Sequence, residues 1–566
     1  MKLRRLEIQN FRCVRALDWR HIAETSALVG PGDSGKSTIL EAIERVLSPK
    51  WNVAFDDTDF WDLLTEVPIV ICATITNLAP SFYRDSKFGL LLHGFETTNG
   101  EAVRASGDAG EEHALVVELR VDASLEPIWS VVDADGEKHP FMARDREALG
   151  MLRVGGYVDQ HLGWSRGSVL TRLTESGDAV SAVLAEATRQ ARSGLKTDGL
   201  EKLTAAAQKV EALGKNLGVA PRATLVPHLD ASALSIAGGA LSLHDGKVPA
   251  RRAGLGTRRL LAVAMQREVA AQSGLTVVDE FEHGLEPHRI RRLLRVLRGR
   301  APEGAGLAKG QLILTTHSPT VLYELEPAEV AVTRRAPDGA VTVQCLPAAV
   351  GYIQKRTPQA LLARRVIVAE GATELGLCQA LDEAWTSETG ASFGYRGVVV
   401  VDGGGGTHPA EIAGHLASLG YEVALIIDSD AKAKVNRAAG AQVFAWPRGL
   451  CTEQCLANDL PEAAITQMAV VADERGGRSV REALADQLGA PRASLKEGDP
   501  VSWINARGLD AFRKAFGDLA KKKNQAWFKT RDQGALLGAL IAQHWTAISK
   551  TPTHEVIGKL RAFAHG

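Results

Sequence analysis

Residues 30–37 read Gly-Pro-Gly-Asp-Ser-Gly-Lys-Ser and match the phosphate-binding loop pattern G-x-x-x-x-G-K-[ST]. The loop follows the short apolar run 27–29, and apolar residues at helical spacing begin just after it. Glycines let backbone N–H groups curl around phosphates, and the helix N-terminus adds partial positive charge. We therefore expect a strand–loop–helix unit that binds a nucleoside triphosphate, here ATP, through Gly30, Asp33, Ser34, Gly35, Lys36, Ser37 and Thr38.

Two later apolar runs end in residues that suit phosphate chemistry. The run 275–278 leads into Asp279 and Glu280, as in a Walker B strand. We expect Asp279 to hold Mg²⁺ with ATP and Glu280 to orient or deprotonate the attacking water. The run 312–314 leads to His317, which in this order fits a γ-phosphate sensor.

Composition limits the classes of protein that remain. A chain of 566 residues predicts two or three domains, and 45% hydrophobic with 23% charged residues is typical of soluble globular proteins. No apolar run reaches the roughly 18 residues of a membrane span, and the start lacks an apolar signal core. Six scattered cysteines favour a reducing cytoplasm over a disulfide framework. We expect a cytoplasmic protein without membrane contact.

The motifs of the first half resemble the ABC/SMC/RecF type of ATPase. The opening Leu-Glu-Ile-Gln-Asn-Phe-Arg, residues 6–12, is similar to that family's start, and residues 282–287 lie where its D-loop would be. Residues 253–261 are the best candidate for its signature segment, although they lack the signature serine. The resemblance implies paired head domains, and hence a homodimer, with the signature supplied in trans.

Acidic residues end three apolar runs in the second half. Glu370 follows 366–369, with Glu374 four residues on; Asp402 follows 398–401; Asp428 and Asp430 follow 424–427. The carboxyl ends of parallel strands face one crevice, so we expect these five acids to meet there. Such a cluster needs cations to offset its repulsion, and oxygen ligands favour Mg²⁺ or Mn²⁺. Acids in this number favour two ions.

The pattern E-G-x-x-E, D-G-G-G, D-x-D resembles a TOPRIM domain. An ATPase head followed by TOPRIM is the layout of the OLD (overcoming lysogenisation defect) family of nucleases, which includes the nuclease subunit of the Gabija antiphage system. By this resemblance Glu453 is a further metal ligand and Lys529 a catalytic lysine. The resemblance also implies a role in phage defence or DNA repair, and some members act beside a UvrD-like helicase.

The predicted fold class is α/β. We expect an ABC/SMC-like P-loop ATPase head interrupted by a helical insertion, then a Rossmann-like TOPRIM domain and a mostly helical C-terminal segment. The expected divisions are the N-terminal part of the head at 1–165, a helical insertion at 166–248 that is expected to dimerise, the C-terminal part of the head at 249–350, and TOPRIM with its helical extension at 360–566. Strands are expected at 67–76 and 114–132.

Charge supports DNA as the substrate. Residues 501–566 hold eleven Lys or Arg against four Asp or Glu, in a chain whose net charge is −1. Lys521, Lys522 and Lys523 lie near Trp527 and Phe528, so cationic and stacking groups adjoin. Cys451 and Cys455 lack a second ligand pair, so we expect helical cysteines and no zinc ribbon.

The leading hypothesis is an ATP-regulated, divalent-metal-dependent DNA endonuclease that cuts by a two-metal mechanism. The alternative is a RecF/SMC-like ATPase that clamps DNA and whose TOPRIM module is non-catalytic. A topoisomerase or primase is disfavoured, because neither a zinc ribbon nor a transesterification domain is present in the sequence. Nicking versus double-strand cutting, and whether ATP activates or restrains cleavage, are not readable from the residues.

Overall fold

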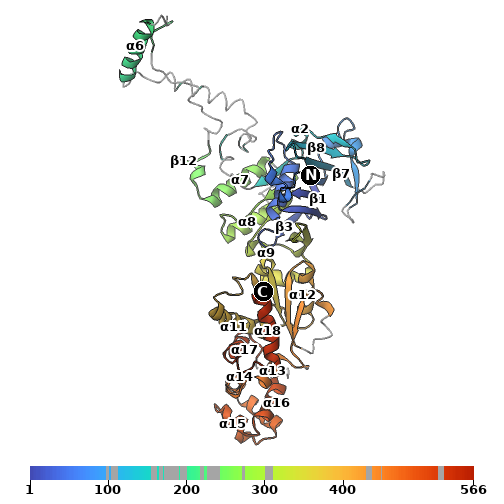
Figure 1. Ribbon diagram of the computed structural model, residues 1–566, viewed down its shortest axis with the longest axis vertical. Helices are drawn as coiled ribbons and strands as arrows, with labels where there is room; N and C mark the ends of the chain where they lie inside the picture. The colour runs from blue at the N-terminus through green and yellow to red at the C-terminus, as the bar shows by residue number, and fades with distance from the viewer. Residues whose placement is uncertain are drawn as a thin grey trace.

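A computed structural model describes residues 1–96, 101–103, 112–154, 162–164, 168, 170, 186, 190, 201–216, 222–225, 242–269, 274–299, 310–428, 436–447, 449–520 and 528–566. Strands β1, β3 and β7 lie toward one end of its long axis and helices α14, α15 and α16 at the other, with α11 and α12 between them (Figure 1). None of the described helices combines the length and the apolar character that crossing a lipid bilayer requires.

The first half contains two sheets that enclose a helix. The first sheet is antiparallel, in the order β2-β1-β4-β7-β5-β6, with β8 and β9 attached beyond β7. Helix α1 (Lys36–Val46) contacts strands of both sheets and buries Ile39, Leu40 and Ile43 between them. The strands of the first sheet are β1 (Lys2–Phe11), β2 (Val14–Trp19), β4 (Ile69–Thr76), β5 (His93–Glu96), β6 (Glu101–Val103), β7 (Glu112–Val121), β8 (Pro127–Val132) and β9 (Lys138–Pro140).

The second sheet carries the phosphate loop. Its order is β10-β13-β14-β3-β15-β16, and all neighbours are parallel except the β15–β16 pair. The strand before the loop therefore lies next to the strand that leads to His317, which in turn pairs with the strand that leads to Asp279. These strands are β10 (Met151–Val154), β13 (Leu275–Val278), β14 (Gln311–Thr315), β3 (Thr25–Val29), β15 (Val330–Arg335) and β16 (Val341–Cys345); the helices beside them are α7 (Leu255–Val269), α8 (Pro287–Leu297), α9 (Pro319–Glu324) and α10 (Gly351–Arg356).

The single strand expected over 114–132 is wrong, because this segment forms the hairpin of β7 and β8. Val116 pairs with Val132 and Val121 with Pro127. The turn is held by Asp122, whose Oδ1 accepts hydrogen bonds from the backbone N–H and the hydroxyl of Ser124. Leu125 adopts a left-handed φ of 62°. A turn built from an aspartate and a serine carries no glycine to mark it, so apolar alternation concealed the break.

The helical insertion expected over 166–248 lies largely outside the described residues. Within the described part, α6 (Glu201–Asn216) is a helix, and β11 (His244–Asp245) pairs with β12 (Val248–Pro249). The boundaries of this insertion, like the other expected domain limits, stay predictions.

The second half is a parallel four-stranded sheet in the order β18-β17-β19-β20. Alternate residues enter opposite cores: Ile367 and Ala369 pack with α11 (Ala372–Thr389), whereas Val366 and Val368 pack with α12 (His408–Ser418). The α12 core also contains residues of β3, β13 and β14, so it joins this sheet to the ATPase sheet. The strands are β17 (Arg365–Ala369), β18 (Val398–Asp402), β19 (Glu422–Ile427) and β20 (Gln442–Ala445), the last absent from our sequence expectations.

The chain ends in helices, which confirms the predicted class of an α/β protein with a mostly helical C-terminal segment. Helix α17 packs closely on α11, because a Cβ atom at Gly534 would lie 1.9 Å from the carbonyl oxygen of Thr373, and one at Gly376 would lie 1.9 Å from that of Arg531. Only glycine permits this approach. The helices are α13 (Thr452–Asp459), α14 (Glu462–Leu488), α15 (Pro500–Asn505), α16 (Leu509–Ala520), α17 (Arg531–Gln543) and α18 (Pro552–His565).

Candidate functional site

Two parallel strands bring the first acids together. Glu370 follows β17 and Asp428 follows β19, and these strands are neighbours in register. The Asp428 backbone N–H donates to Glu370 Oε2 over 2.7 Å, so the two strand ends are bonded to each other. The expectation that neighbouring strand ends would meet therefore holds for this pair.

Thr452 links Asp428 to a third carboxylate, that of Glu374. Its hydroxyl lies 2.7 Å from Glu374 Oε1 and 3.3 Å from Asp428 Oδ1, and its backbone N–H donates to the same Asp428 oxygen over 3.0 Å. The Thr452 side chain is fully buried, and Glu374, in the first turn of α11, is only 7% exposed. Sequence reasoning missed this threonine; the only signal was its place beside Glu453.

Burial and mutual repulsion raise the pKa values of two of these acids. Burial, followed by the charge of Asp428, raises the pKa of Glu374 to about 8. Burial, followed by the charges of Glu370 and Glu453, raises the pKa of Asp428 to about 7. Buried carboxylates that repel one another take up either protons or a cation. Several oxygen donors without nitrogen or sulfur fit a hard divalent ion such as Mg²⁺ or Mn²⁺.

Lys529 reaches this cluster from the C-terminal segment. Its Nζ lies 2.9 Å from Oε1 of Glu453, which is 2% exposed and sits in the first turn of α13. Burial opposes the charge on Lys529, but the carboxylate and hydrogen bond of Glu453 outweigh it and raise the lysine pKa. Lys529 directly precedes α17, so the close packing of α17 on α11 determines where the lysine lies.

Asp402 and Asp430 are the two remaining acids of the predicted set, and of the two only Asp402 is among the described residues. Asp402 ends β18 beside β17, and its Oδ1 accepts a hydrogen bond from the Gly404 N–H over 2.9 Å. Asp402 is the register partner of Ala369, and the Gly405 N–H of the same turn donates to the Glu370 carbonyl oxygen over 2.8 Å. Asp430 lies outside the described residues, as do Lys521, Lys522, Lys523 and Trp527.

The phosphate loop has the conformation that its glycines predict. Gly35, at the N-cap of α1, has φ 93°, and Gly30 lies so close to β15 that a Cβ atom there would be 2.4 Å from the Thr333 carbonyl oxygen. Lys36 folds back, with Nζ 2.7 Å from the Pro31 carbonyl oxygen. The remaining predicted nucleotide ligands belong to the loop and its helix. The Ser34 hydroxyl donates to the Pro31 carbonyl oxygen over 2.9 Å, and Asp33 has a left-handed φ of 58°. Thr38 Oγ1 lies 3.1 Å from Cys13 Sγ.

Asp279 faces the loop as predicted, and Thr315 orients it. The Thr315 hydroxyl donates to Asp279 Oδ1 over 2.6 Å, and the Ser37 hydroxyl donates to the same oxygen over 3.3 Å. Thr315 also accepts a hydrogen bond from the Glu280 N–H over 2.8 Å. Thr315 ends the strand before His317, and nothing in its sequence context marked it as functional.

Glu280 and His317 lie on this same edge. Glu280 has a left-handed φ of 46° and a largely exposed side chain, 3.3 Å from Nδ1 of His283. The His317 N–H donates to Glu282 Oε1 over 2.6 Å. Burial, followed by the nearby charge of Lys36, lowers the pKa of His317, so its imidazole is held neutral beside the loop.

The candidate signature segment contacts the Walker B strand of its own chain. Arg259, buried in α7, donates to the Asp279 carbonyl oxygen over 2.5 Å and to that of His283 over 3.2 Å. These contacts give the segment a structural role in cis. The function expected for it in trans stays a prediction.

Comparison with known proteins assigns the class of each half. Residues 1–87 match the family described as AAA ATPase domain, and residues 152–322 match AAA domain, putative AbiEii toxin, Type IV TA system. Residues 361–430 match the TOPRIM domain described as overcoming lysogenization defect protein-like. The chain is thus a P-loop ATPase joined to a TOPRIM domain.

The three domain matches and one curated relative together support an ATPase–TOPRIM protein of the OLD family. A curated relative, the OLD nuclease of Thermus scotoductus, is 45% identical over 49 residues, which span 9% of each chain. Among solved structures, an Smc head bound to the C-winged helix domain of ScpA gives a TM-score of 0.36 at 13% identity, covering 61% of this chain and 98% of that one. An Smc head from Pyrococcus furiosus gives 0.33 at 12% identity, covering 61% and 96%.

Proposed function

We propose that the protein is a divalent-metal-dependent DNA endonuclease whose cleavage is regulated by ATP. The observation that carries the proposal is the meeting of Glu370, Glu374, Asp428 and Glu453 with Lys529. Two of these acids directly follow β17 and β19, two lie in α11 and α13, and the lysine lies shortly before α17. Burying charged groups in this number costs free energy of folding, so the cluster indicates a functional site.

The acids are the proposed metal ligands. Glu370, Glu374, Asp402, Asp428 and Glu453 are the described members of the set, and Asp430 completes it. Bound Mg²⁺ or Mn²⁺, in a pair, supplies activation of water and neutralisation of charge at the phosphodiester. The contribution of Thr452 is to hold Glu374 and Asp428 at one spacing, since a ligand oriented by a neighbour loses less freedom on binding.

Lys529 is the proposed catalytic cation. Its ion pair with Glu453 keeps it protonated, and its half-exposed side chain is accessible to a phosphate. A fixed ammonium group stabilises the negative charge that develops on phosphate oxygens during cleavage. The excess of basic residues over 501–566 supports DNA as the polymer that is cut.

The ATPase half is the proposed regulator. Lys36 binds the β- and γ-phosphates, Ser37 and Asp279 hold one further Mg²⁺ with ATP, Glu280 positions water and His317 senses the γ-phosphate. We further propose a cytoplasmic homodimer that acts in phage defence or DNA repair. A UvrD-like helicase partner has no support in the comparisons, and the proposal does not depend on one.

The test is digestion of a supercoiled plasmid with Mg²⁺, Mn²⁺ or Ca²⁺, each with and without ATP. We expect cleavage in Mg²⁺ or Mn²⁺ and its loss in Asp428→Asn. Asp510→Asn is the matched control, because Asp510 is exposed in α16 of the same half. Cleavage that survives in Asp428→Asn refutes the site. A protein that binds DNA and ATP but neither binds divalent ions in the TOPRIM half nor cuts is the DNA-clamping ATPase.

A further inference from the structure

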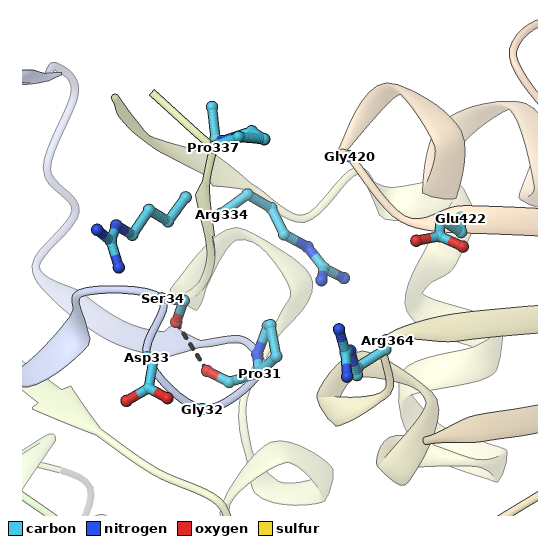
Figure 2. A pocket seen from close by; sticks show the side chains of 11 residues that line it. Pro31, Gly32, Asp33, Ser34, Arg334, Pro337, Arg364, Gly420 and Glu422 are labelled. Atoms are coloured by element: carbon cyan, nitrogen blue, oxygen red, sulfur yellow. Dashed lines mark hydrogen bonds between the residues drawn. The ribbon is translucent and has the colours of Figure 1, made fainter. Parts of the chain in front are cut away.

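A cavity lies between the phosphate loop and the TOPRIM sheet. Its volume is about 440 Å³, and residues 31–34 of the loop form one wall. The opposite wall comes from the TOPRIM half, where Arg364, Gly420 and Glu422 line it (Figure 2). Arg334 and Arg335, at the end of β15, complete it. The cavity shares Asp33 and Ser34 with the predicted nucleotide ligands, but Lys36, Ser37 and Asp279 do not line it, so it adjoins the nucleotide site on another side of the loop.

The cavity is lined by three guanidinium groups, of Arg334, Arg335 and Arg364, and by two carboxylates, of Asp33 and Glu422. Arg334 and Arg364 extend toward the same space from the ATPase strand and the TOPRIM half (Figure 2). Among the described residues, neither these two nor Arg335 forms an ion pair. Glu422, the acid on the TOPRIM wall, is bound instead by Arg365, whose Nε donates to it over 2.7 Å. The positive charge of the cavity is therefore only partly compensated.

Arg334 supplies the most specific observation. Its guanidinium carbon lies 3.6 Å from the centre of the Tyr421 ring, which fixes the plane of the group. Its Nε and Nη2 atoms are buried, and no acceptor among the described residues satisfies them. A guanidinium that an aromatic ring holds in one plane at the wall of a cavity is oriented in advance for a ligand with acceptor oxygens.

We propose that this cavity binds a small oligophosphate anion, such as pyrophosphate or the phosphates of a free nucleotide. The guanidinium fork matches phosphate oxygens in pairs, and the cavity volume suits a small molecule. An anion here contacts residues 31–34 of the phosphate loop and the start of β19, the strand that leads to Asp428. An anion bound in the cavity would therefore contact both the phosphate loop of the ATPase half and a strand of the TOPRIM half.

The test is calorimetric titration of the full-length protein with pyrophosphate in a Lys36→Ala background, which weakens binding at the nucleotide site. We expect one binding event that persists in this background and weakens about tenfold or more on addition of Arg364→Gln or Arg335→Gln. Both arginines are exposed, so their replacement does not threaten folding. Arg334→Gln should have the larger effect. Arg120→Gln removes an exposed charge from β7 and should change nothing.

Three results would overturn the proposal. The first is the absence of pyrophosphate binding in Lys36→Ala, and the second is binding that the arginine variants leave unchanged. The third is arginine-dependent binding of a short single-stranded DNA oligonucleotide without any binding of pyrophosphate, which would make the cavity a DNA contact. None of these results depends on nuclease activity, so a failure of the nuclease proposal leaves this test intact.

Discussion

Lys529 forms its ion pair with Glu453 across 76 residues of sequence, at 2.9 Å between Nζ and Oε1. Glu453 is buried and the lysine is half exposed. One end of this pair is therefore fixed within the acidic cluster, while the other faces solvent, where a substrate phosphate can approach. The pair connects the C-terminal helices to the acids that follow the strands of the TOPRIM sheet.

Lys529→Met should reduce the rate constant of plasmid cleavage by about 10² to 10³-fold while leaving ATP binding unchanged. The physical reason is the loss of a fixed positive charge beside the phosphate in the transition state. Single-turnover cleavage at saturating Mn²⁺ measures it. Lys514→Met, at an exposed position on α16, is the control. Wild-type cleavage by Lys529→Met would remove the lysine from the mechanism.

Thr452→Val should weaken Mn²⁺ binding roughly 10- to 100-fold, because Glu374 and Asp428 lose the hydroxyl that orients them. Thr452→Ser keeps the hydroxyl and should stay within a few-fold of the wild type. Calorimetric titration with Mn²⁺ in the absence of DNA measures the affinity. Equal affinities in the valine and serine variants would show that the hydroxyl plays no part.

Gly534→Ala should lower the free energy of unfolding by roughly 1–3 kcal/mol and also slow cleavage. The added methyl group meets the Thr373 carbonyl oxygen, so α17 must move away from α11 and carry Lys529 with it. Urea unfolding measures the first effect and plasmid cleavage the second. Gly558→Ala is the matched control, because a methyl group in that part of α18 meets open space and alanine favours a helix. A Gly534→Ala protein as stable as Gly558→Ala would contradict the packing argument.

The metal-free protein should lose stability as pH rises. Glu374 has a pKa raised to about 8 in the folded protein against an ordinary value of 4.5, so between these values the folded state holds a proton that the unfolded chain has released. Its stabilising contribution is complete below pH 4.5 and disappears as pH rises through 8. Thermal unfolding in chelator across pH 5 to 8.5 should show the decline. Glu374→Gln should flatten it, and Mg²⁺ should reverse it at pH 8. A slope unchanged by Glu374→Gln would assign the decline to other groups.

Patterns of adjacent residues in the sequence predicted part of the nucleotide site and part of the TOPRIM acid cluster. The phosphate loop, Asp279 after β13, and Glu370 and Asp428 after β17 and β19 were predictable because a strand end and its next residue are contiguous in sequence. The hairpin at 122–126 was missed because its turn depends on side-chain hydrogen bonds. Strand β20 was missed as well. Thr315 and Thr452 were missed because a threonine gains its role only from the acids that surround it in space.

The sequence by itself determined the two chemistries available to this protein, a triphosphate-binding loop and a set of carboxylates at strand ends, because each is encoded in a few consecutive residues. Only the tertiary structure decided which groups share a site. Register between β17 and β19 joined Glu370 to Asp428, and register between β17 and β18 placed Asp402 opposite Ala369. The glycine contacts of α11 with α17 brought Lys529 to Glu453, and the packing of the two halves placed Arg334 against Tyr421. These contacts join residues distant in sequence, so they exist only once the surrounding elements have packed.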